Sequence, residues 1–182
     1  MVTDLTQLRQ TKLPNTEPSK TVGIISDTHI PTRTTTLPSA IQQAFQNVDY
    51  IIHAGDLIEL TVVDELEQIA PVLAVQGNLD TATTKDALPK SDQLRIMNWT
   101  IDVTHDLVNT FGTDNLHEIA RKNKFDVFVF GHTHAAGIRW EGKTLFVNPG
   151  SPTDPQPPFL RKPTVAILKI TKESLTPRIL DI

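Results

Sequence analysis

Residues 21–31 read TVGIISDTHIP, an apolar run rich in β-branched residues that ends in an aspartate and a histidine. Such a run predicts a buried strand, and two similar runs follow along the chain. The stretches between the runs carry apolar residues at helical spacing. Strands that alternate with helices form parallel sheets, so this half of the chain predicts an α/β fold. The predicted elements are strand Thr21–Ser26, helix Pro38–Gln46, strand Asp49–Ala54, helix Leu60–Ile69 and strand Pro71–Gln76.

The second half predicts further strands and one helix. Glu141-Gly142-Lys143 is a good hairpin turn between two apolar runs, so antiparallel pairing joins the parallel strands. The predicted helix is Asp114–Asn123, and the predicted strands are Gln93–Met97, Thr100–Thr104, Phe125–Phe130, Ile138–Trp140, Thr144–Val147, Thr164–Ile170 and Arg178–Ile182.

Length and composition describe an ordinary globular chain. With 182 residues, 38% of them hydrophobic and 21% charged, one domain over residues 21–182 is expected. Residues 1–20 are polar and lack the apolar stretch of a signal peptide, so they predict a flexible N-terminal segment. The absence of cysteine excludes disulfides, thiolate metal sites and cysteine nucleophiles. It fits a reducing compartment, and a cytoplasmic location is expected.

Charge and hydropathy narrow the range of partners. The net charge of −4 argues against non-specific binding to nucleic acid, which needs a basic surface. No apolar run reaches the length of about 18 residues that a membrane span requires, so no membrane partner is expected. The hairpin near Trp140 and the proline-rich loop near Pro155 are candidate contact surfaces for a homo-oligomer.

Polar side chains of the types that commonly bind metals follow five of the predicted strands. The clusters are Asp27-Thr28-His29, Gly55-Asp56, Gly77-Asn78, His105-Asp106 and Gly131-His132-Thr133-His134. The carboxyl ends of parallel strands open onto the crevice where α/β proteins bind ligands, so these groups are expected to converge. If the chain stays extended, the two members of an Asp-x-His or His-x-His pair project to the same side and grip one ion. Each motif has an ordinary structural explanation, but five in succession favour a metal site.

In this order, the five motifs resemble those of the calcineurin-like metallophosphoesterases. The resemblance runs from about residue 21 to 151, and Asn148-Pro149-Gly150-Ser151 is similar to a segment of the family's small bacterial and archaeal phosphodiesterase branch. It implies two β-sheets packed as a sandwich and flanked by helices, with mixed parallel and antiparallel strands. It also implies hydrolysis of a phosphate ester.

The resemblance further implies the ligands of two divalent cations. Asp27, His29 and His134 would hold one, and Asn78, His105 and His132 the other, with Asp56 bridging the two. Asp56, Asn78 and His105 would thereby take part directly in catalysis. Nitrogen and oxygen donors of this kind suit manganese, which is the first expectation, and also iron, nickel, zinc or cobalt.

The net charge of the proposed metal site favours a small phosphate ester as substrate. Two divalent cations beside the carboxylates of Asp27 and Asp56 leave two positive charges, which a bridging hydroxide and an anionic ester would neutralise. The hypothesis is direct attack by that hydroxide without a covalent intermediate. The expected activity is phosphodiester hydrolysis. The alternatives are phosphomonoester hydrolysis at the same site, a nuclease that uses Arg121, Lys122 and Lys124, and a non-catalytic metal-binding scaffold of the same fold.

Several residues near the motifs have open roles. Leu79 stands where larger family members carry a proton-donating histidine, which leaves the donor to the leaving group unidentified. Asp106 replaces a more usual glycine and either points into solvent or narrows the substrate range. His53 is expected to orient Asp56 or its loop. Two further residues are expected to support the site or contact substrate. Asp80 either tethers the Asn78 loop, contacts substrate or is a surface turn residue, and Arg33 lies in a neighbouring loop.

Overall fold

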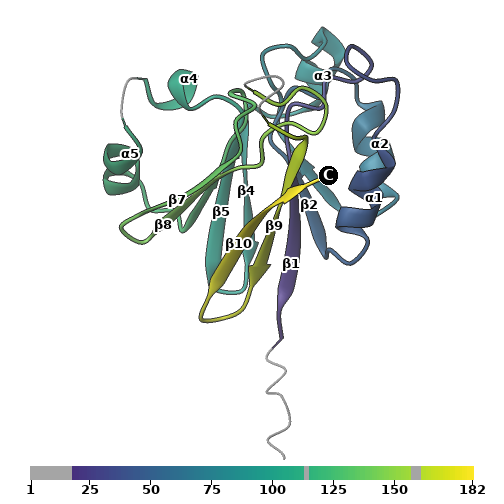
Figure 1. The fold of residues 1–182 in the computed structure, drawn as a ribbon. Coiled ribbons are helices and arrows are strands. Elements are labelled where there is room, and N and C mark those ends of the chain that lie inside the picture. Colours follow the sequence, from purple (N-terminus) through teal and green to yellow (C-terminus); the bar gives the residue numbers. More distant parts are fainter. Residues whose placement is uncertain (1–17, 113–114, 157–160) are drawn as a thin grey trace, which may run out of the picture.

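The computed structural model describes residues 18–112, 115–156 and 161–182 and builds them into two five-stranded sheets (Figure 1). The first sheet has the strand order β10-β9-β1-β2-β3 and the second β4-β5-β6-β8-β7. The strands are β1 Lys20–Ile25, β2 Tyr50–His53, β3 Val72–Ala74, β4 Ser91–Ile96, β5 Trp99–Thr104, β6 Val127–Val129, β7 Gly137–Glu141, β8 Thr144–Asn148, β9 Thr164–Ile170 and β10 Leu175–Asp181. The helices are α1 Ser39–Phe45, α2 Thr61–Glu67, α3 Ala82–Ala87, α4 Leu107–Phe111 and α5 Leu116–Lys122.

Strand pairing confirms the predicted mixed α/β sandwich. β1, β2 and β3 run parallel, as do β5, β6 and β8, whereas β9, β10, β4 and β7 add antiparallel pairs. The hairpin turn between β7 and β8 lies where the sequence predicts it, with Gly142 in the left-handed region at φ 62°. The expected flexible segment 1–20 falls largely on residues 1–17, which lie outside the described part. A single domain over 21–182 stays a prediction.

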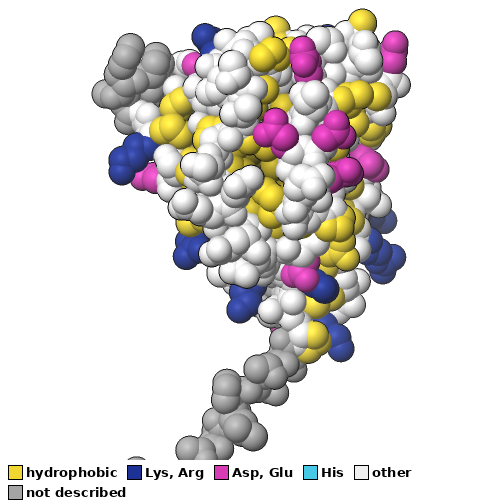
Figure 2. All heavy atoms as spheres, turned by 90° about the vertical axis from the view of Figure 1, so that its right-hand side faces the viewer, with side chains coloured by type: hydrophobic (Ala, Val, Ile, Leu, Met, Phe, Trp, Pro, Cys, Tyr) yellow, Lys and Arg dark blue, Asp and Glu magenta, His cyan; other side chains and the backbone are white. Residues whose placement is uncertain are grey.

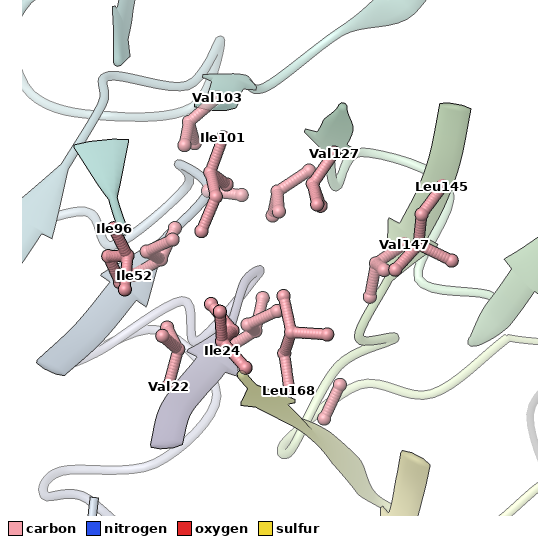
Figure 3. Close-up of a cluster of buried hydrophobic side chains, with 14 of the residues drawn as sticks. Val22, Ile24, Ile52, Ile96, Ile101, Val103, Val127, Leu145, Val147 and Leu168 are labelled. Atoms are coloured by element: carbon pink, nitrogen blue, oxygen red, sulfur yellow. The ribbon is translucent and has the colours of Figure 1, made fainter. Parts of the chain in front are cut away.

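The core lies in three layers because successive strand residues face opposite sides of a sheet. Ile24 of β1 points into the space between the sheets, where valine, isoleucine and leucine side chains of both sheets face one another (Figure 3). The next residue, Ile25, faces the other way and packs with Ile41 and Phe45 of α1. On the outer face of the second sheet, Ile119 of α5 packs in a further buried cluster with phenylalanine side chains.

Helices therefore cover the outer face of each sheet, α1 and α2 beside the first and α4 and α5 beside the second (Figure 1). Capping explains where α5 begins: the Asn115 side chain accepts from the Glu118 amide while the Glu118 side chain accepts from the Asn115 amide. The sequence pattern does not predict two of the helices, α3 and α4. Among the described residues, no helix is long and apolar enough to cross a membrane.

Candidate metal centre

All seven predicted ligand residues lie in loops at the carboxyl ends of strands. Asp27 and His29 follow β1, Asp56 follows β2 and Asn78 follows β3. In the second sheet, His105 follows β5, and His132 and His134 follow β6. These loops meet at one end of the sandwich, the upper end in Figure 1, so both sheets contribute to a single site.

Three side chains from both sheets form the first set. The Nε2 atoms of His29 and His134 lie 3.2 Å apart, and Asp27 Oδ1 lies 3.4 Å from His134 Nε2 and 3.9 Å from His29 Nε2. Asp27 is fully buried and His29 almost so, whereas His134 is partly exposed. The three groups offer ligand atoms that all lie within 4.8 Å of one another, close enough to hold one cation.

The second set converges on the side-chain oxygen of Asn78. His105 Nε2 lies 2.9 Å from Asn78 Oδ1 and His132 Nδ1 lies 3.0 Å from it. Asp56 Oδ2 lies 3.4 Å from His105 Nε2 and 3.9 Å from His29 Nε2, so this carboxylate faces one histidine of each set. Asp27 also lies within 4.8 Å of the ligand atoms of Asp56 and His105, which links the two sets a second time.

The backbone that presents these side chains is not extended, contrary to the geometry assumed from the sequence. Asp27, His29, Asp56, His132 and His134 all have positive φ, between 48° and 69°. Non-glycine residues rarely adopt this conformation, and it costs on the order of 1–3 kcal/mol at each position. Hydrogen bonds between the loops offset part of that cost, since the Asp27 and His29 amides donate to the carbonyls of Gly55 and Asp56. Interlocked left-handed turns therefore bring the ligand pairs together.

Main-chain carbonyls orient two of the histidines, a feature that has no signature in the sequence. His105 Nδ1 donates to the Ala54 carbonyl at 2.8 Å, and His134 Nδ1 donates to the Asp154 carbonyl at 2.7 Å. A carbonyl oxygen only accepts, so the hydrogen of each neutral ring is on Nδ1 and the lone pair is on Nε2. Both Nε2 atoms face the site, which is the tautomer that a metal ligand needs.

Burial and neighbouring charges shift the pKa values of two of these side chains, Asp27 and His105. Burial raises the pKa of Asp27 to about 6, against the opposing charges of His105 and His134. Burial also acts to lower the pKa of His105, but its hydrogen bond to Asp56 and the charges of Asp27 and Asp56 outweigh it and raise that pKa to about 9. The site therefore retains a proton on His105 at neutral pH when no cation is bound.

We predict that the metal-free protein loses stability as the pH rises from about 7 to 9. The pKa of His105 is about 9 in the folded state, against about 6.5 for an ordinary histidine, so the folded state binds the extra proton across this range. The stabilisation is complete below the unfolded pKa and is lost as the pH passes through the folded one. In EDTA, the melting temperature should fall by a few degrees across this pH range. His105→Gln should flatten this dependence, and an equal slope in that variant would contradict the assignment.

Glycines next to the ligands allow loops to approach more closely than other residues could. Gly55 has φ 91°, which is consistent with the sharp turn expected before Asp56. A Cβ atom at Gly77 would lie 2.1 Å from Asp56 Oδ1, and one at Gly131 would lie 1.9 Å from Ser26 Oγ and 2.7 Å from an oxygen of Asp27. At Gly77 and Gly131 the missing side chain makes room for the ligand carboxylates.

Three residues expected near the ligands have distinct places. His53 is fully buried and its Nε2 bonds the hydroxyl of Thr28, so it contacts the first ligand loop; burial lowers its pKa to about 3 and keeps the ring neutral. Asp80 is buried and its two oxygens accept from the amides of Ile58 and Gly77, which fits the tether among its predicted roles. Arg33 forms an ion pair with Asp154 at 2.9 Å.

The segment Asn148–Ser151 forms hydrogen bonds with the loops after β1 and β6, which carry candidate ligands. The Asn148 amide nitrogen donates to the Gly131 carbonyl and to the Thr133 hydroxyl, which fixes the loop after β6. The Ser151 hydroxyl donates to the Asp27 carbonyl at 2.7 Å, which fixes the loop after β1. A sequence motif that carries no ligand thus connects the loops from the two sheets.

Leu79 and Asp106, the two residues that depart from the family pattern, both contact candidate ligands. The Leu79 amide donates to Asp56 Oδ1 at 2.7 Å, while its side chain is 57% exposed. Its backbone therefore orients the candidate ligand Asp56, although its side chain has no proton to transfer. Asp106 does not point away into solvent: Oδ2 lies 3.7 Å from His132 Nε2, and Oδ1 accepts from the Val108 amide.

Several known proteins are similar to this chain in sequence. Residues 21–173 match the model of the calcineurin-like phosphoesterase superfamily domain. The chain is 39% identical over 160 residues to a probable metallophosphoesterase of Methanothermobacter thermautotrophicus, covering 87% of this chain and 91% of the relative. It is 33% identical over 142 residues to a protein named a phosphodiesterase from Methanocaldococcus jannaschii, covering 71% and 82%.

Among solved structures, Vacuolar Protein Sorting 29 from Cryptosporidium parvum superposes with a TM-score of 0.77. The two chains are 22% identical, and the match covers 90% of this chain and 92% of the other. A likeness at this identity establishes the shared fold of the two-sheet sandwich.

Proposed function

Because the chain belongs to the calcineurin-like phosphoesterase superfamily, we propose that it is a phosphodiesterase that uses two divalent cations. One observation supports the proposal most strongly: the lone pairs of histidine nitrogens and of carboxylate and amide oxygens point into one site. The Nε2 atoms of His105 and His134 carry lone pairs in the neutral rings, and they face the oxygens of Asp56, Asn78 and Asp27 at 2.9 to 3.4 Å. Acceptors packed at these distances repel unless protons or cations lie between them. The donor set therefore fits cations, and the proton held by His105 takes the place of one in their absence.

The two sets are the proposed ligands of the two cations. Asp27, His29 and His134 would hold one and Asn78, His105 and His132 the other, with Asp56 facing both. Nitrogen and oxygen donors without a thiolate suit manganese, and also iron, nickel, zinc or cobalt. When bound, such a pair would activate a water molecule and stabilise the charge that develops on the phosphoryl oxygens.

The residues around the set define what the protein itself contributes. The Leu79 amide donates to Asp56 Oδ1 and leaves Oδ2 directed at the histidines. The His132 amide donates to both oxygens of Asp27, at 3.2 and 3.1 Å. These bonds fix the two carboxylates, whose charges favour cations over protons as the pH rises.

The occupied guanidinium of Arg33 favours a diester over a monoester. A monoester presents a more highly charged terminal phosphate, which proteins commonly bind with a bidentate arginine. Arg33 is engaged by Asp154, and Arg161 donates to the Ala136 carbonyl. A relative named a phosphodiesterase supports the same choice. Comparing bis(p-nitrophenyl) phosphate with p-nitrophenyl phosphate in the presence of manganese tests it, and a faster monoester reaction would contradict it.

The surface also supports a small substrate over nucleic acid. Figure 2 shows the face covered by α1 and α2, where acidic side chains lie across the upper half and lysine and arginine side chains lie mostly along the lower margins. Helix α2 carries Asp64, Glu65 and Glu67. Arg121 and Lys122 lie in the last turn of α5, where the helix dipole favours cations without any nucleic acid.

We predict a steep dependence of rate on the pKa of the leaving group. The Leu79 side chain has no proton to give, and general acid catalysis normally contributes roughly 10²–10⁴-fold. Substrates with poor leaving groups should therefore lose most. A series of aryl and alkyl phosphodiesters measured with saturating manganese would show this as a strongly negative slope of log kcat against leaving-group pKa. A flat plot, with chemistry rate-limiting, would show that another residue donates the proton.

The non-catalytic alternative gives a different pair of results. A metal-binding scaffold would retain about two metal ions per chain, as the two ligand sets predict, yet hydrolyse neither class of ester. Metal analysis of the purified protein, coupled to the two assays, separates the readings. One metal ion per chain in the fully loaded, active protein would contradict the dinuclear proposal.

A further inference from the structure

A pocket adjoins the second ligand set and opens beside Asn78 and His105. Its volume is about 400 Å³, and it is enclosed by the loop after β3, by α3, by the beginning of β4 and by the end of β5 with the helix that follows. We call it the lysine pocket, and its remaining lining residues are Gln76, Gly77, Lys85, Lys90, Thr104, Asp106 and Thr110. A substrate held at Asn78 and His105 has part of its surface facing this space.

Two ammonium groups, those of Lys85 and Lys90, are the charged donors that line the pocket. Lys85 Nζ donates to the Asn78 carbonyl at 2.7 Å and retains two further N–H groups. Within the described part of the chain, neither Lys85 nor Lys90 forms an ion pair with a carboxylate. The two lysines outweigh the one carboxylate that lines the pocket, that of Asp106, so its charge is positive.

Three other polar side chains of the lysine pocket are already hydrogen-bonded within the protein. The Gln76 side-chain nitrogen donates to the carbonyls of Lys85 and Leu88. The hydroxyls of Thr104 and Thr110 lie 2.9 Å apart and bond each other, and that of Thr110 also donates to the Asp106 carbonyl. Internal hydrogen bonds thus fix these walls, and the charged donors for a ligand are the two lysines.

A second pocket, beside His134, is less suited to an anion. It has a volume of about 480 Å³ and contains Arg161 and Lys162. Lys162 is paired with Asp181 at 3.4 Å, and both residues line the pocket, so its charges partly cancel. Arg161 donates to the Ala136 carbonyl. The lysine pocket differs because neither of its ammonium groups is paired with a carboxylate, and Lys85 keeps two N–H groups beyond its bond to the Asn78 carbonyl.

We propose that the lysine pocket binds a second phosphate of the substrate. The substrate is then a phosphodiester one of whose arms carries a further phosphate group, with the diester at the two ligand sets and the second phosphate between Lys85 and Lys90. This inference rests on the proposed phosphodiesterase function. It follows from the location of the pocket next to Asn78 and from its net positive charge.

A matched series of substrates tests the proposal. Ethyl p-nitrophenyl phosphate is compared with analogues whose alkyl arms of two, three or four carbons end in a phosphate, so that the leaving group never changes. In the wild-type protein with manganese, the best phosphorylated analogue should have a kcat/KM at least about ten-fold higher, as expected for charge-assisted hydrogen bonds. Added salt should reduce this advantage.

Variants then locate the second phosphate. Lys85→Met and Lys90→Met should each lower the ratio of the two kcat/KM values about five-fold or more, which corresponds to the loss of one charged contact. Taking the ratio removes any general effect of Lys85 on the Asn78 loop. Lys143→Met, in the turn between β7 and β8, is the matched control and should leave the ratio unchanged. An unchanged ratio in both pocket variants, or its loss in Arg161→Met, overturns the proposal.

A binding measurement separates this proposal from the function on which it rests. If none of the diesters is hydrolysed, the proposed function fails, and calorimetry still tests the pocket. Propane-1,3-diyl bisphosphate should bind the manganese-loaded protein at least about ten-fold more tightly than propyl phosphate does, with the difference lost in Lys90→Met. Equal affinities for the two ligands in the wild-type protein would overturn the inference whether or not the protein is an enzyme.

Discussion

Replacing Asp56 by asparagine should lower kcat for bis(p-nitrophenyl) phosphate by more than about 100-fold, beyond the range typical of residues that only support a ligand. Asp56 Oδ2 faces His29 at 3.9 Å and His105 at 3.4 Å, so one carboxylate serves both ligand sets. Asparagine keeps the shape and an oxygen to accept from the Leu79 amide, but it removes the negative charge. Of the seven proposed ligands, Asp27 alone would then remain anionic.

Metal content should change together with activity in this variant. Elemental analysis after gel filtration should show that Asp56→Asn retains less metal than the wild-type protein, while circular dichroism shows the same fold. Asp92→Asn is the matched control, since Asp92 is an exposed residue of β4 whose carboxylate accepts only from the neighbouring Gln93 amide among the described contacts. Activity within ten-fold of wild type, with metal content unchanged, would remove Asp56 from the centre.

The strands and the helices α1, α2 and α5 could be predicted because each depends on local hydrophobic periodicity. The run around Ile24 and Ile25 is apolar on both faces because one face meets the second sheet and the other meets α1. The helix α3 reads ATTKDA and has no large apolar residue, so its sequence gives no helical stripe. It forms because the Thr81 side chain caps it and because Gln76 binds carbonyls at its end.

The seven candidate side chains could be selected from the sequence, but the way they converge could not be predicted. The order of the motifs selected the seven side chains, whereas the left-handed turns at Asp27, His29 and Asp56 arise from hydrogen bonds between loops distant in the chain. The same limit applies to the carbonyls of Ala54 and Asp154, since every residue has a carbonyl and only the fold selects those that meet an imidazole. The lysine pocket likewise exists only after β3, β4 and β5 have assembled.

Gly131→Ala, in the loop after β6, should lower both the stability and the metal affinity of the protein. The added Cβ would lie 1.9 Å from Ser26 Oγ and 2.7 Å from Asp27 Oδ2, well inside van der Waals contact. Neither neighbour can move freely: Ser26 donates to the Ala54 carbonyl, and Asp27 is fully buried and accepts from the His132 amide. Overpacking of this kind costs on the order of 1–3 kcal/mol of unfolding free energy.

Metal binding should suffer more than folding does, because the methyl group displaces the carboxylate of the first ligand set, which also lies within 4.8 Å of the ligand atoms of Asp56 and His105. We expect at least about ten-fold weaker manganese binding by calorimetry, as for loss of an outer-shell support, with a melting temperature lowered by several degrees. Gly137→Ala is the control: its Cβ would meet nothing within 4 Å, and its φ is outside the left-handed region. If Gly131→Ala lost stability but bound manganese as tightly as Gly137→Ala, Asp27 would be a packing residue, and the cations would have to be held by the remaining six side chains.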